Sequence, residues 1–255
     1  EDYGLEPAVV LKRQMTLLVV NEQSQAEICT HILKANFLGL DPSNFFFMIQ
    51  PSFPGLIPSP NGWRYDPGTT RRLHNHGQLA MQKTRDNQWF TLDSSRQRHD
   101  LGRNDNYGRR DSVADLVSYN IEDLDYLTAA LDFDTVGLAL ALGDEGFGMT
   151  MEIVPNNPEH PIKGGLCAYD PALDRDVMIE SFRLLGLPPE KIGHLNKNFN
   201  HYPSPALVFK KLHEEGLFMP VVVKDGGLYF QPVQGDMNFL TRTAFICRRR
   251  SHPSK

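Results

Sequence analysis

The chain has 255 residues, of which 40% are hydrophobic and 22% are charged, and its formal net charge is −5. This composition is typical of a globular protein and excludes a largely disordered chain. The longest apolar stretch falls far short of the roughly 20 residues that a bilayer crossing needs, so we expect no membrane span. The mild acidity argues against a nucleic-acid partner, for which a basic surface is required.

The first predicted elements are a strand, a helix and a second strand. "MTLLVVNEQS" predicts a buried strand over 15–20, and "SQAEICTHILKANFLGL" has the apolar spacing of a helix with Ser24 as its cap. "NFFFMIQPSFPGLIPS" predicts a second strand, which Pro51 and Pro54 interrupt. Two strands joined through a helix indicate a βαβ unit and therefore parallel pairing.

The middle of the chain is more polar. "HGQLAMQKTRDNQWF" predicts a short helix, and the segment over about 91–112 predicts a polar loop or insertion. We place no domain boundary there. The sequence predicts one domain over 1–247, followed by a basic tail over 248–255.

Later segments predict strands over 116–119 and 149–154, and a helix over 124–131 between them. An antiparallel pair is expected around a turn at 170–174. "PSPALVFKKLHEEG" predicts a helix with proline in its first turn and Gly216 at its end. "FMPVVVKDGGLYFQP" predicts a strand followed by a turn. Alternating strands and helices indicate an α/β fold with some antiparallel pieces.

The three cysteines are widely spaced and form no C-x-x-C pair. We expect Cys29, Cys167 and Cys247 to be small buried side chains in a reducing compartment. The sequence begins with Glu1 and shows no signal-peptide pattern. Targeting residues would lie outside it, which leaves the cytoplasm and the plastid stroma both open.

Polar stretches that follow apolar strands are the places to look for a site in an α/β protein. "MEIVPNNPEHPIKGG" is one of them. Its glycines, Gly164 and Gly165, would let the backbone approach a ligand, and Lys163 would supply a positive charge for an anion. The alternative is a two-glycine turn with a solvated lysine.

"NIED" supplies Asn120, Glu122 and Asp123 at another strand end. Carboxylate and amide oxygens suit Mg²⁺, although the same residues also suit a helix N-cap. "HNHG" is a weak metal motif, and "GDEGFG" is not followed by the helix that a dinucleotide fingerprint requires. No nucleophile elbow and no Cys–His motif is present.

In order and spacing, these blocks resemble those of the UTP:sugar-1-phosphate uridylyltransferases, the UDP-glucose and related UDP-sugar pyrophosphorylases. The blocks run from "LLVVNEQS" and "FMIQPSFP" through "SYNIEDLDYLTAALD", "VMIESFRL" and "LNKNFNHYPSPALVFKKL" to "MPVVVKDGG". The resemblance spans roughly 10–240. It implies a GT-A-like nucleotidyltransferase core, with a mixed, mostly parallel sheet flanked by helices.

The resemblance also implies a role for each matching position. Lys224 and Lys163 would face the phosphates or the sugar phosphate as catalytic lysines, and Glu122 would help hold Mg²⁺. The substrate-binding positions would be Gln50 near the uracil, His76 and Gly77 near nucleotide and sugar phosphate, Asn120 beside the nucleotide, Gly164, Gly165 and Glu180 in the sugar pocket, and Asn196 and Asn198 near the sugar phosphate.

The implied reaction joins UTP and a sugar 1-phosphate into a UDP-sugar and pyrophosphate. Two departures from the family stand out: Glu122 replaces an aspartate, and the Gly-rich loop that holds the triphosphate has no match, since its place would precede Glu1. The sequence therefore predicts a core that is incomplete at its N-terminus. A non-catalytic relative, acting as a structural or nucleotide-sugar-binding subunit of a larger assembly, is the alternative.

Overall fold

The computed structural model describes residues 4, 6–85, 89–102, 108, 109, 112–118 and 133–247. The chain divides into two compact units: unit 1 comprises Glu1–Gly108 and Met219–Pro232, and unit 2 comprises Arg109–Phe218 and Val233–Lys255. The single domain predicted over 1–247 stays a prediction. The predicted helix over 124–131 and the basic tail over 248–255 lie outside the described residues.

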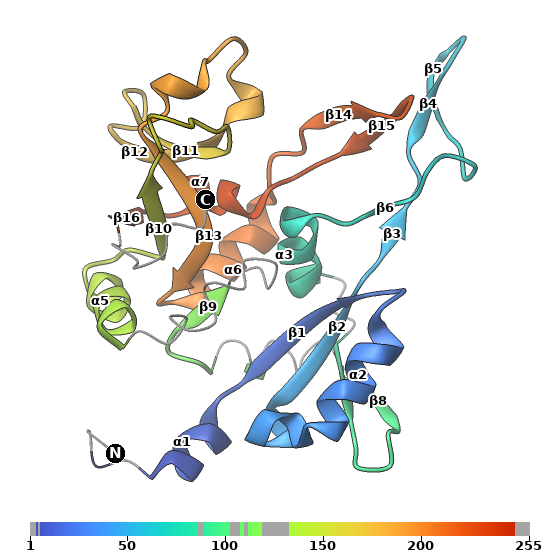
Figure 1. Cartoon of the computed structure of the whole chain (residues 1–255), viewed down its shortest axis with the longest axis vertical. Coiled ribbons are helices and arrows are strands. Elements are labelled where there is room, and N and C mark those ends of the chain that lie inside the picture. The colour runs from blue at the N-terminus through green and yellow to red at the C-terminus, as the bar shows by residue number, and fades with distance from the viewer. Residues whose placement is uncertain are drawn as a thin grey trace. The chain divides into compact units, whose positions relative to one another are not determined.

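The described part of unit 1 carries two four-stranded sheets, one two-stranded sheet and several helices (Figure 1). Its helices are α1 (Pro7–Arg13), α2 (Gln25–Lys34) and α3 (His76–Arg85). Its strands are β1 (Thr16–Asn21), β2 (Phe45–Gln50), β3 (Ser52–Phe53), β4 (Leu56–Ser59), β5 (Gly62–Tyr65), β6 (Arg72–Leu73), β7 (Trp89–Leu92), β8 (Arg98–Asp100), β14 (Val221–Lys224) and β15 (Gly227–Phe230).

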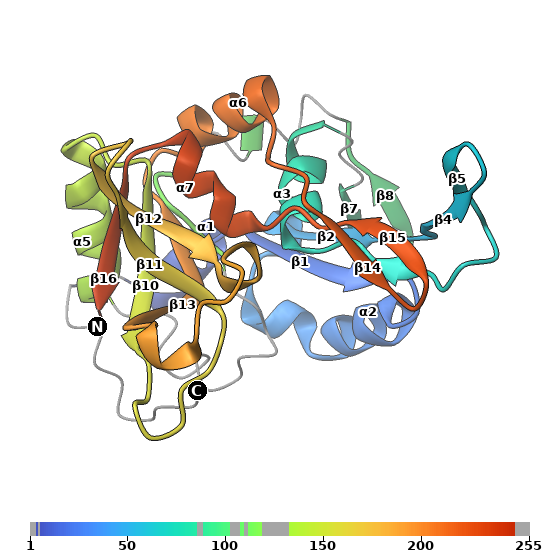
Figure 2. The same ribbon diagram turned by 90° about the horizontal axis from the view of Figure 1, so that it is seen from above.

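The core of unit 1 forms on both faces of the sheet β1-β2-β7-β8. β2 has no polar residue before its last position, and its side chains alternate between the two faces. Phe45 and Phe47 pack with Phe90 and with side chains of α2, whereas Phe46 and Met48 pack with Trp89 and with Leu79 of α3. Figure 2 shows α2 and α3 on opposite sides of β1 and β2. A strand that is covered on both sides needs such a continuous apolar run.

The predicted βαβ unit is confirmed. β1 and β2 pair in parallel from Thr16↔Phe45 to Asn21↔Gln50, with α2 as the connection between them. The second half of unit 1 is antiparallel: β14, β15, β4 and β5 form one hairpin sheet in that order. Asp225 and Gly226 join β14 to β15, and both have positive φ, as a two-residue hairpin turn requires.

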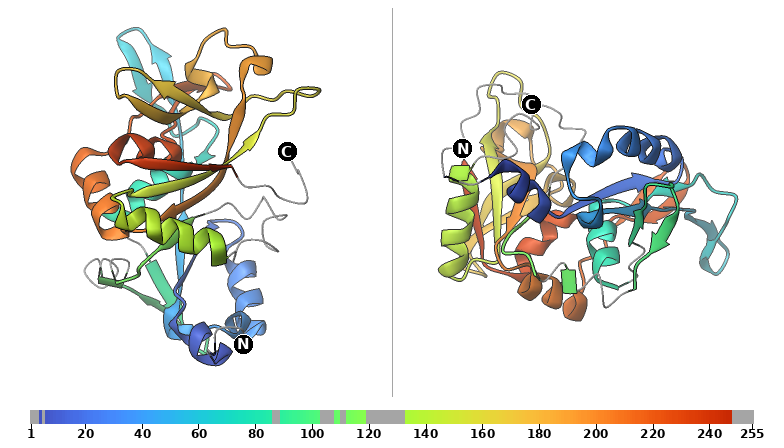
Figure 3. Two further views of the ribbon diagram at one scale, coloured as in Figure 1. Left: turned by 90° about the vertical axis from the view of Figure 1, so that its left-hand side faces the viewer. Right: turned by 90° about the horizontal axis from the view of Figure 1, so that it is seen from below.

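Unit 2 is built on a sheet with the path β12-β11-β13-β10-β16, and β9 pairs with β13. Its strands are β9 (Leu116–Ser118), β10 (Met149–Pro155), β11 (Gly165–Asp170), β12 (Arg175–Glu180), β13 (His194–Tyr202) and β16 (Thr243–Cys247). Its helices are α5 (Phe133–Asp144), α6 (Pro205–Glu215), the 3₁₀ turn η6 (Gln234–Asp236) and α7 (Met237–Leu240), and α5 packs against β10 and β13 (Figure 3).

The α/β class is confirmed, but parallel pairing does not dominate the described strands. Only β1–β2 and β10–β16 pair in parallel there. The other described pairs are antiparallel, because short turns such as the one between β11 and β12 can only join antiparallel neighbours. The polar segment over 91–112 was predicted as a loop, and it contains part of the hairpin β7–β8.

All three cysteines are unpaired. Cys29 and Cys167 are half-buried, and burial raises the pKa of the Cys167 thiol to about 11. Cys247, at the end of β16, is exposed, so its predicted burial is wrong.

Among the helices that the structure describes, none combines the length and the apolar character that a bilayer crossing needs.

Candidate functional site

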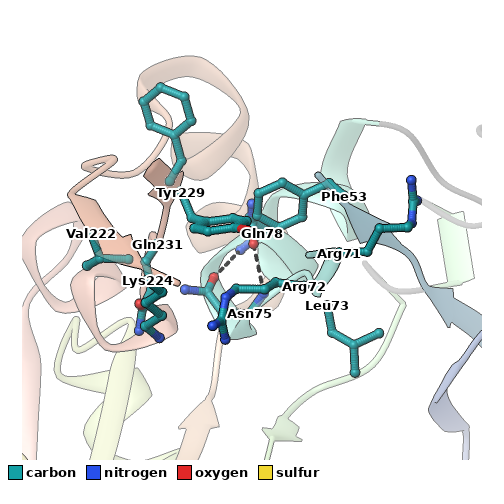
Figure 4. Close-up of a pocket in the computed structure, with 11 residues that line it drawn as sticks. Phe53, Arg71, Arg72, Leu73, Asn75, Gln78, Val222, Lys224, Tyr229 and Gln231 are labelled. Atoms are coloured by element: carbon teal, nitrogen blue, oxygen red, sulfur yellow. Dashed lines mark hydrogen bonds between the residues drawn. The ribbon is translucent and has the colours of Figure 1, made fainter. Parts of the chain in front are cut away.

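Unit 1 contains a pocket of about 350 Å³, which lies between the β14–β15 hairpin and the segment that leads into α3 (Figure 4). We call it the unit 1 pocket. It combines aromatic, amide and cationic side chains. The residues that line it are Phe53, Arg71, Arg72, Leu73, Asn75, Gln78, Val222, Lys224, Tyr229, Phe230 and Gln231.

One wall of the unit 1 pocket is fixed by the start of α3. The backbone N–H of Asn75 donates to Gln78 Oε1 at 2.8 Å, and the N–H of Gln78 donates back to Asn75 Oδ1 at 3.3 Å. This reciprocal pair is a capping box, whose N-cap and N3 residues can be found in the sequence "NHGQ". The N–H of Gly77 donates to the carbonyl of Pro232, which ties the helix start to the end of the hairpin segment.

Tyr229 forms the aromatic part of the wall. Its ring fits against two glycines: a Cβ on Gly55 would lie 2.8 Å from the ring, and one on Gly227 would lie 2.9 Å from it. Its hydroxyl donates to the carbonyl of Thr70 at 2.6 Å, and the ring meets Phe53 edge-on. Both glycines are thus needed for the ring to sit where it does.

The cations of the unit 1 pocket differ in how they are engaged. Arg71 donates to the hydroxyl and carbonyl oxygens of Ser52. Arg72 pairs with Asp225, and its guanidinium lies over the Tyr229 ring. Lys224 is exposed and has no ion pair within the described part of the chain. A negatively charged group in the unit 1 pocket would therefore meet Lys224 without displacing a carboxylate.

Lys224 is the only predicted site residue that lines the unit 1 pocket. Gln50, at the end of β2, donates from Nε2 to the carbonyl of His74, next to the pocket residue Asn75. His76 and Gly77 open α3, so they also follow directly on this wall. The fold thus gathers Gln50, His76, Gly77 and Lys224 in unit 1.

Lys83 lies on the same helix as His76 and is half-buried. Burial lowers the pKa of Lys83 from 10.5 to about 8, so the unfolded chain binds more protons than the folded chain between about pH 8 and 10.5. Stability should therefore rise with pH across this window. In urea unfolding, the Lys83→Met variant should not show this rise. At pH 7 its free energy of unfolding should exceed that of the wild-type chain by on the order of 1–3 kcal/mol. Equal pH profiles for both chains would contradict the prediction.

Unit 2 brings four predicted residues together around Gly165. Gly165 on β11 pairs with Glu180 on β12, and β13 runs along the other side of β11. A Cβ on Gly165 would lie 3.2 Å from Glu180 Oε1 and 3.3 Å from the Cβ of Asn196. The carboxylate and the amide side chain therefore lean over the glycine backbone from its two neighbouring strands. We call Gly165, Glu180, Asn196 and Asn198 the unit 2 cluster.

The amides of the unit 2 cluster are held by each other. Asn196 Nδ2 donates to Asn198 Oδ1 at 3.1 Å, and the N–H of Asn198 donates to Asn196 Oδ1 at 2.9 Å. Asn198 has φ +56°, which asparagine tolerates better than most residues. It lies where the register of β10 and β13 shifts, between Met151↔Asn200 and Ile153↔Asn196. Such bulges redirect side chains and occur often beside functional sites.

The charge on Glu180 is set by its surroundings. Burial raises the pKa of Glu180, and the Asp236 carboxylate raises it further, while the Arg183 guanidinium lowers it. Arg183 holds Asp236 with two hydrogen bonds of 2.7 and 2.5 Å, and Asp236 is 2% exposed. Glu180 is therefore the carboxylate that stays open to a ligand, because both oxygens of Asp236 are already occupied.

The remaining predicted residues are placed differently. Lys163 is exposed on the turn between β10 and β11, and the N–H of Ser181 donates to the carbonyl of Gly164 at 3.1 Å. Asn120 and Glu122 lie outside the described residues. The described residues hold no group of three or more His, Cys, Asp or Glu side chains that could bind a metal ion. They do not by themselves form a magnesium site, and binding through Glu122 stays a prediction.

The mixed sheets, the unit 1 pocket and the unit 2 cluster fit an α/β fold of the nucleotidyltransferase type. No protein-family model and no curated protein matches the sequence. Solved structures do match. A UDP-glucose phosphorylase from Trypanosoma brucei has a TM-score of 0.58 at 17% identity, over 93% of this chain and 54% of that one.

Two further structures show the same likeness. A single-residue mutant of UDP-glucose pyrophosphorylase from Leishmania major has a TM-score of 0.59 at 15% identity, over 92% of this chain and 52% of that one. A UDP-N-acetylglucosamine pyrophosphorylase from Trypanosoma brucei has a TM-score of 0.55 at 11% identity, over 91% and 47%. The chain thus has the fold of UDP-sugar pyrophosphorylases, and it spans about half the length of these structures.

Several residues of the unit 1 pocket and of the surroundings of Glu180 were not predicted from the sequence. Arg71, Arg72 and Tyr229 line the unit 1 pocket, and Arg183 and Asp236 control the charge around Glu180. The adjacent arginines in "TTRRLHNHG" were a usable signal, since they stand four residues before His76. No local pattern marks Tyr229 or Asp236, because their roles depend on segments far away in the sequence.

Proposed function

We propose that this chain binds a UDP-sugar and belongs to the catalytic core of an enzyme that forms it from UTP and a sugar 1-phosphate. The observation that carries the proposal is the convergence of Gly165, Glu180, Asn196 and Asn198. A family resemblance had selected these residues from three separate blocks of sequence. The likeness to UDP-sugar pyrophosphorylases in fold supports the same reading.

In this proposal the unit 2 cluster holds the sugar. The Glu180 carboxylate accepts hydrogen bonds from sugar hydroxyls, and the amides of Asn196 and Asn198 lie towards the sugar phosphate. Gly165 keeps Glu180 in place, since a Cβ there would lie 2.9 Å from Met178 Sδ and 3.2 Å from Glu180 Oε1 and would displace one of them. The sugar itself is not specified, because selectivity depends on contacts with individual hydroxyl groups.

The lysines would supply positive charge. In such a reaction an oxygen of the sugar phosphate attacks the α-phosphorus of UTP, and the bond to the pyrophosphate leaving group breaks. Catalysis rests on positioning and charge neutralisation, with no covalent protein intermediate. Lys224 and Lys163 are exposed and suited to contact phosphates. Mg²⁺ bound through Glu122 would neutralise further charge on the phosphates, and the contacts assigned to Lys224 and Lys163 do not require it.

A binding assay tests the first part of the proposal. UDP-glucose at about 100-fold its Kd should raise Tm by about 5–10 °C, because a ligand that binds only the folded chain stabilises it. Lys163→Ala and Lys224→Ala should each remove most of this shift. Lys34→Ala is the matched control, since Lys34 is exposed on α2 and is not among the residues that line the unit 1 pocket. No Tm shift with millimolar UDP-glucose or UTP would contradict the proposal.

A turnover assay separates the enzyme from the alternative. Pyrophosphate release from UTP and glucose 1-phosphate, or N-acetylglucosamine 1-phosphate, should be detectable and should fall with Lys224→Ala. Binding without pyrophosphate release would favour a non-catalytic relative that acts as a nucleotide-sugar-binding or structural subunit.

A further inference from the structure

One face of the hairpin sheet β14-β15-β4-β5 is apolar at every paired position. Residues that lie opposite each other in antiparallel strands point to the same face. Val223 lies opposite Leu228, Leu228 opposite Leu56, and Leu56 opposite Tyr65. These four side chains form one row across all four strands.

The neighbouring positions extend this row on the same face, since side chains two residues apart in a strand point the same way. Val221 pairs with Phe230, and Pro58 pairs with Trp63. The complete set, which we call the apolar sheet face, is Leu56, Pro58, Trp63, Tyr65, Val221, Val223, Leu228 and Phe230. No residue of this set is charged.

The apolar sheet face is open to solvent. Val223 is 68% exposed and Tyr65 is 60% exposed, while Trp63, Val221 and Phe230 are 49%, 48% and 41% exposed. Aromatic side chains alone carry about 150–250 Å² each, so these five residues present on the order of 400 Å² of apolar surface. A patch of that size is comparable to the largest one that a typical monomer exposes, about 300–600 Å², and such patches are often functional.

The opposite face of the same sheet makes this distribution unusual. Lys224, Val222 and Tyr229 alternate with the apolar set and line the unit 1 pocket, to which Phe230 of the apolar set also contributes. An antiparallel sheet normally carries its polar residues on a solvated face. Here the charged Lys224 and Arg64 are both exposed on the other face, and the apolar sheet face carries no charged residue.

We propose that the apolar sheet face is the contact between two copies of this chain in solution. A two-fold axis would set this uncharged face against itself, so no charge is buried without a partner. Two sheets that pack face to face lie about 10 Å apart and interdigitate their side chains. The apolar area matches the core of a small dimer interface, whose standard size is about 800 Å² per partner including the polar rim.

Other occupants fit the apolar sheet face less well. Sugars are recognised by aromatic rings together with polar groups that fix the hydroxyls, and the set offers two such groups, the Tyr65 hydroxyl and the Trp63 indole N–H, both on β5. A helix or sheet that lies on anionic lipid uses Lys and Arg beside its apolar residues. The set contains neither residue, and the chain has a formal charge of −5.

Analytical ultracentrifugation over about 1–100 µM tests the proposal, since that range covers a micromolar Kd. The wild-type chain should change from monomer to dimer within it. Val223→Glu, which places a carboxylate from each copy in the contact, should raise the dimer Kd at least about tenfold. Trp63→Ser, on a different strand of the same face, should also weaken the dimer. Circular dichroism and Tm confirm that each variant is folded.

Leu185→Glu is the matched control, because Leu185 is 97% exposed and belongs to unit 2. It should leave the dimer Kd unchanged. A wild-type chain that stays monomeric throughout, or a Val223→Glu variant that associates as tightly as wild type, would overturn the proposal. Co-sedimentation of the monomeric wild-type chain with phosphatidylcholine and phosphatidylserine vesicles, lost in Val223→Glu, would assign the face to lipid and overturn it too.

Discussion

Asn238→Ala should lower the free energy of unfolding by about 3–5 kcal/mol, as measured by urea denaturation. Asn238 is fully buried and makes three hydrogen bonds to the backbone. Its Oδ1 accepts from the N–H of Met178 at 3.0 Å. Its Nδ2 donates to the carbonyls of Met178 and Gly235, at 3.0 and 2.7 Å. Alanine would leave these backbone groups buried without a partner, and each such group costs about 1–3 kcal/mol.

The position of Met178 explains why this side chain matters for the site. β12 ends the sheet path of unit 2, so the Asn238 amide pairs with a backbone edge that no strand covers along that path. Met178 lies two residues before Glu180 on the same strand. Asn44→Ala is the matched control: Asn44 donates to the carbonyl of Lys12 in an exposed hydrogen bond, and its loss should cost under about 1 kcal/mol. Equal costs for the two variants would contradict the prediction.

Asp236→Asn should destabilise the chain by about 3–5 kcal/mol and should also lower the pKa of Glu180. The variant leaves the Arg183 guanidinium, which is 17% exposed, without its carboxylate partner, and breaking a buried pair from one side carries a cost of this size. Burial raises the pKa of Glu180, the Asp236 carboxylate raises it further, and the Arg183 guanidinium lowers it. Asp236→Asn leaves the effect of burial, removes the charge that raises the pKa and keeps the charge that lowers it.

Two measurements check this prediction. Urea denaturation gives the loss of stability, and an NMR titration of the glutamate side-chain carbons gives the pKa of Glu180 in both chains. Asp66→Asn is the control, because its pair with Arg64 at 3.8 Å is open to solvent and should contribute less than about 1 kcal/mol. An unchanged or higher pKa of Glu180 in Asp236→Asn would show that the Asp236 charge does not act on it.

Both substitutions, at Asn238 and at Asp236, change residues that hold β12 and the charge around Glu180, and neither changes Glu180 itself. The short segment η6 and α7 supplies Asp236 and Asn238 and docks on β12 through them. Gly235 in this segment must be a glycine as long as Met178 keeps its place, since a Cβ there would lie 1.6 Å from Met178 Cε. Weakening this segment should therefore reduce sugar binding in the proposed function as well as stability.

Much of the local structure could be predicted from the sequence. β1, α2 and β2 follow from an apolar run, a helical spacing and a second apolar run, and these signals are local. α6 begins at Pro205 and ends before Gly216, as its end residues indicate. The segment of α5 has no clear helical spacing, because leucines and alanines lie all around the helix: Ala139 is buried while Leu138 and Leu140 are exposed.

The unit 2 cluster could also be predicted in part. The order of the sequence blocks led to Gly165, Glu180 and Asn196, and the fold places these residues on three adjacent strands. The bulge that gives Asn198 its positive φ has no local signal, because it arises from the register between β10 and β13. Asn120 and Glu122, which lie outside the described residues, stay predictions.

By itself, the sequence determined the α/β class, the parallel β1–β2 pair and the candidate site residues of unit 2, since periodicity, turn residues and block order are carried by neighbouring residues. Only the tertiary structure decided which distant residues share a face, a pocket or a charge. It set Arg72 against Tyr229 and Asp225, Asp236 beside Glu180, and eight apolar side chains on one side of a hairpin sheet. Strand register between remote segments creates these contacts, and a register shift of one residue would turn each side chain to the other face.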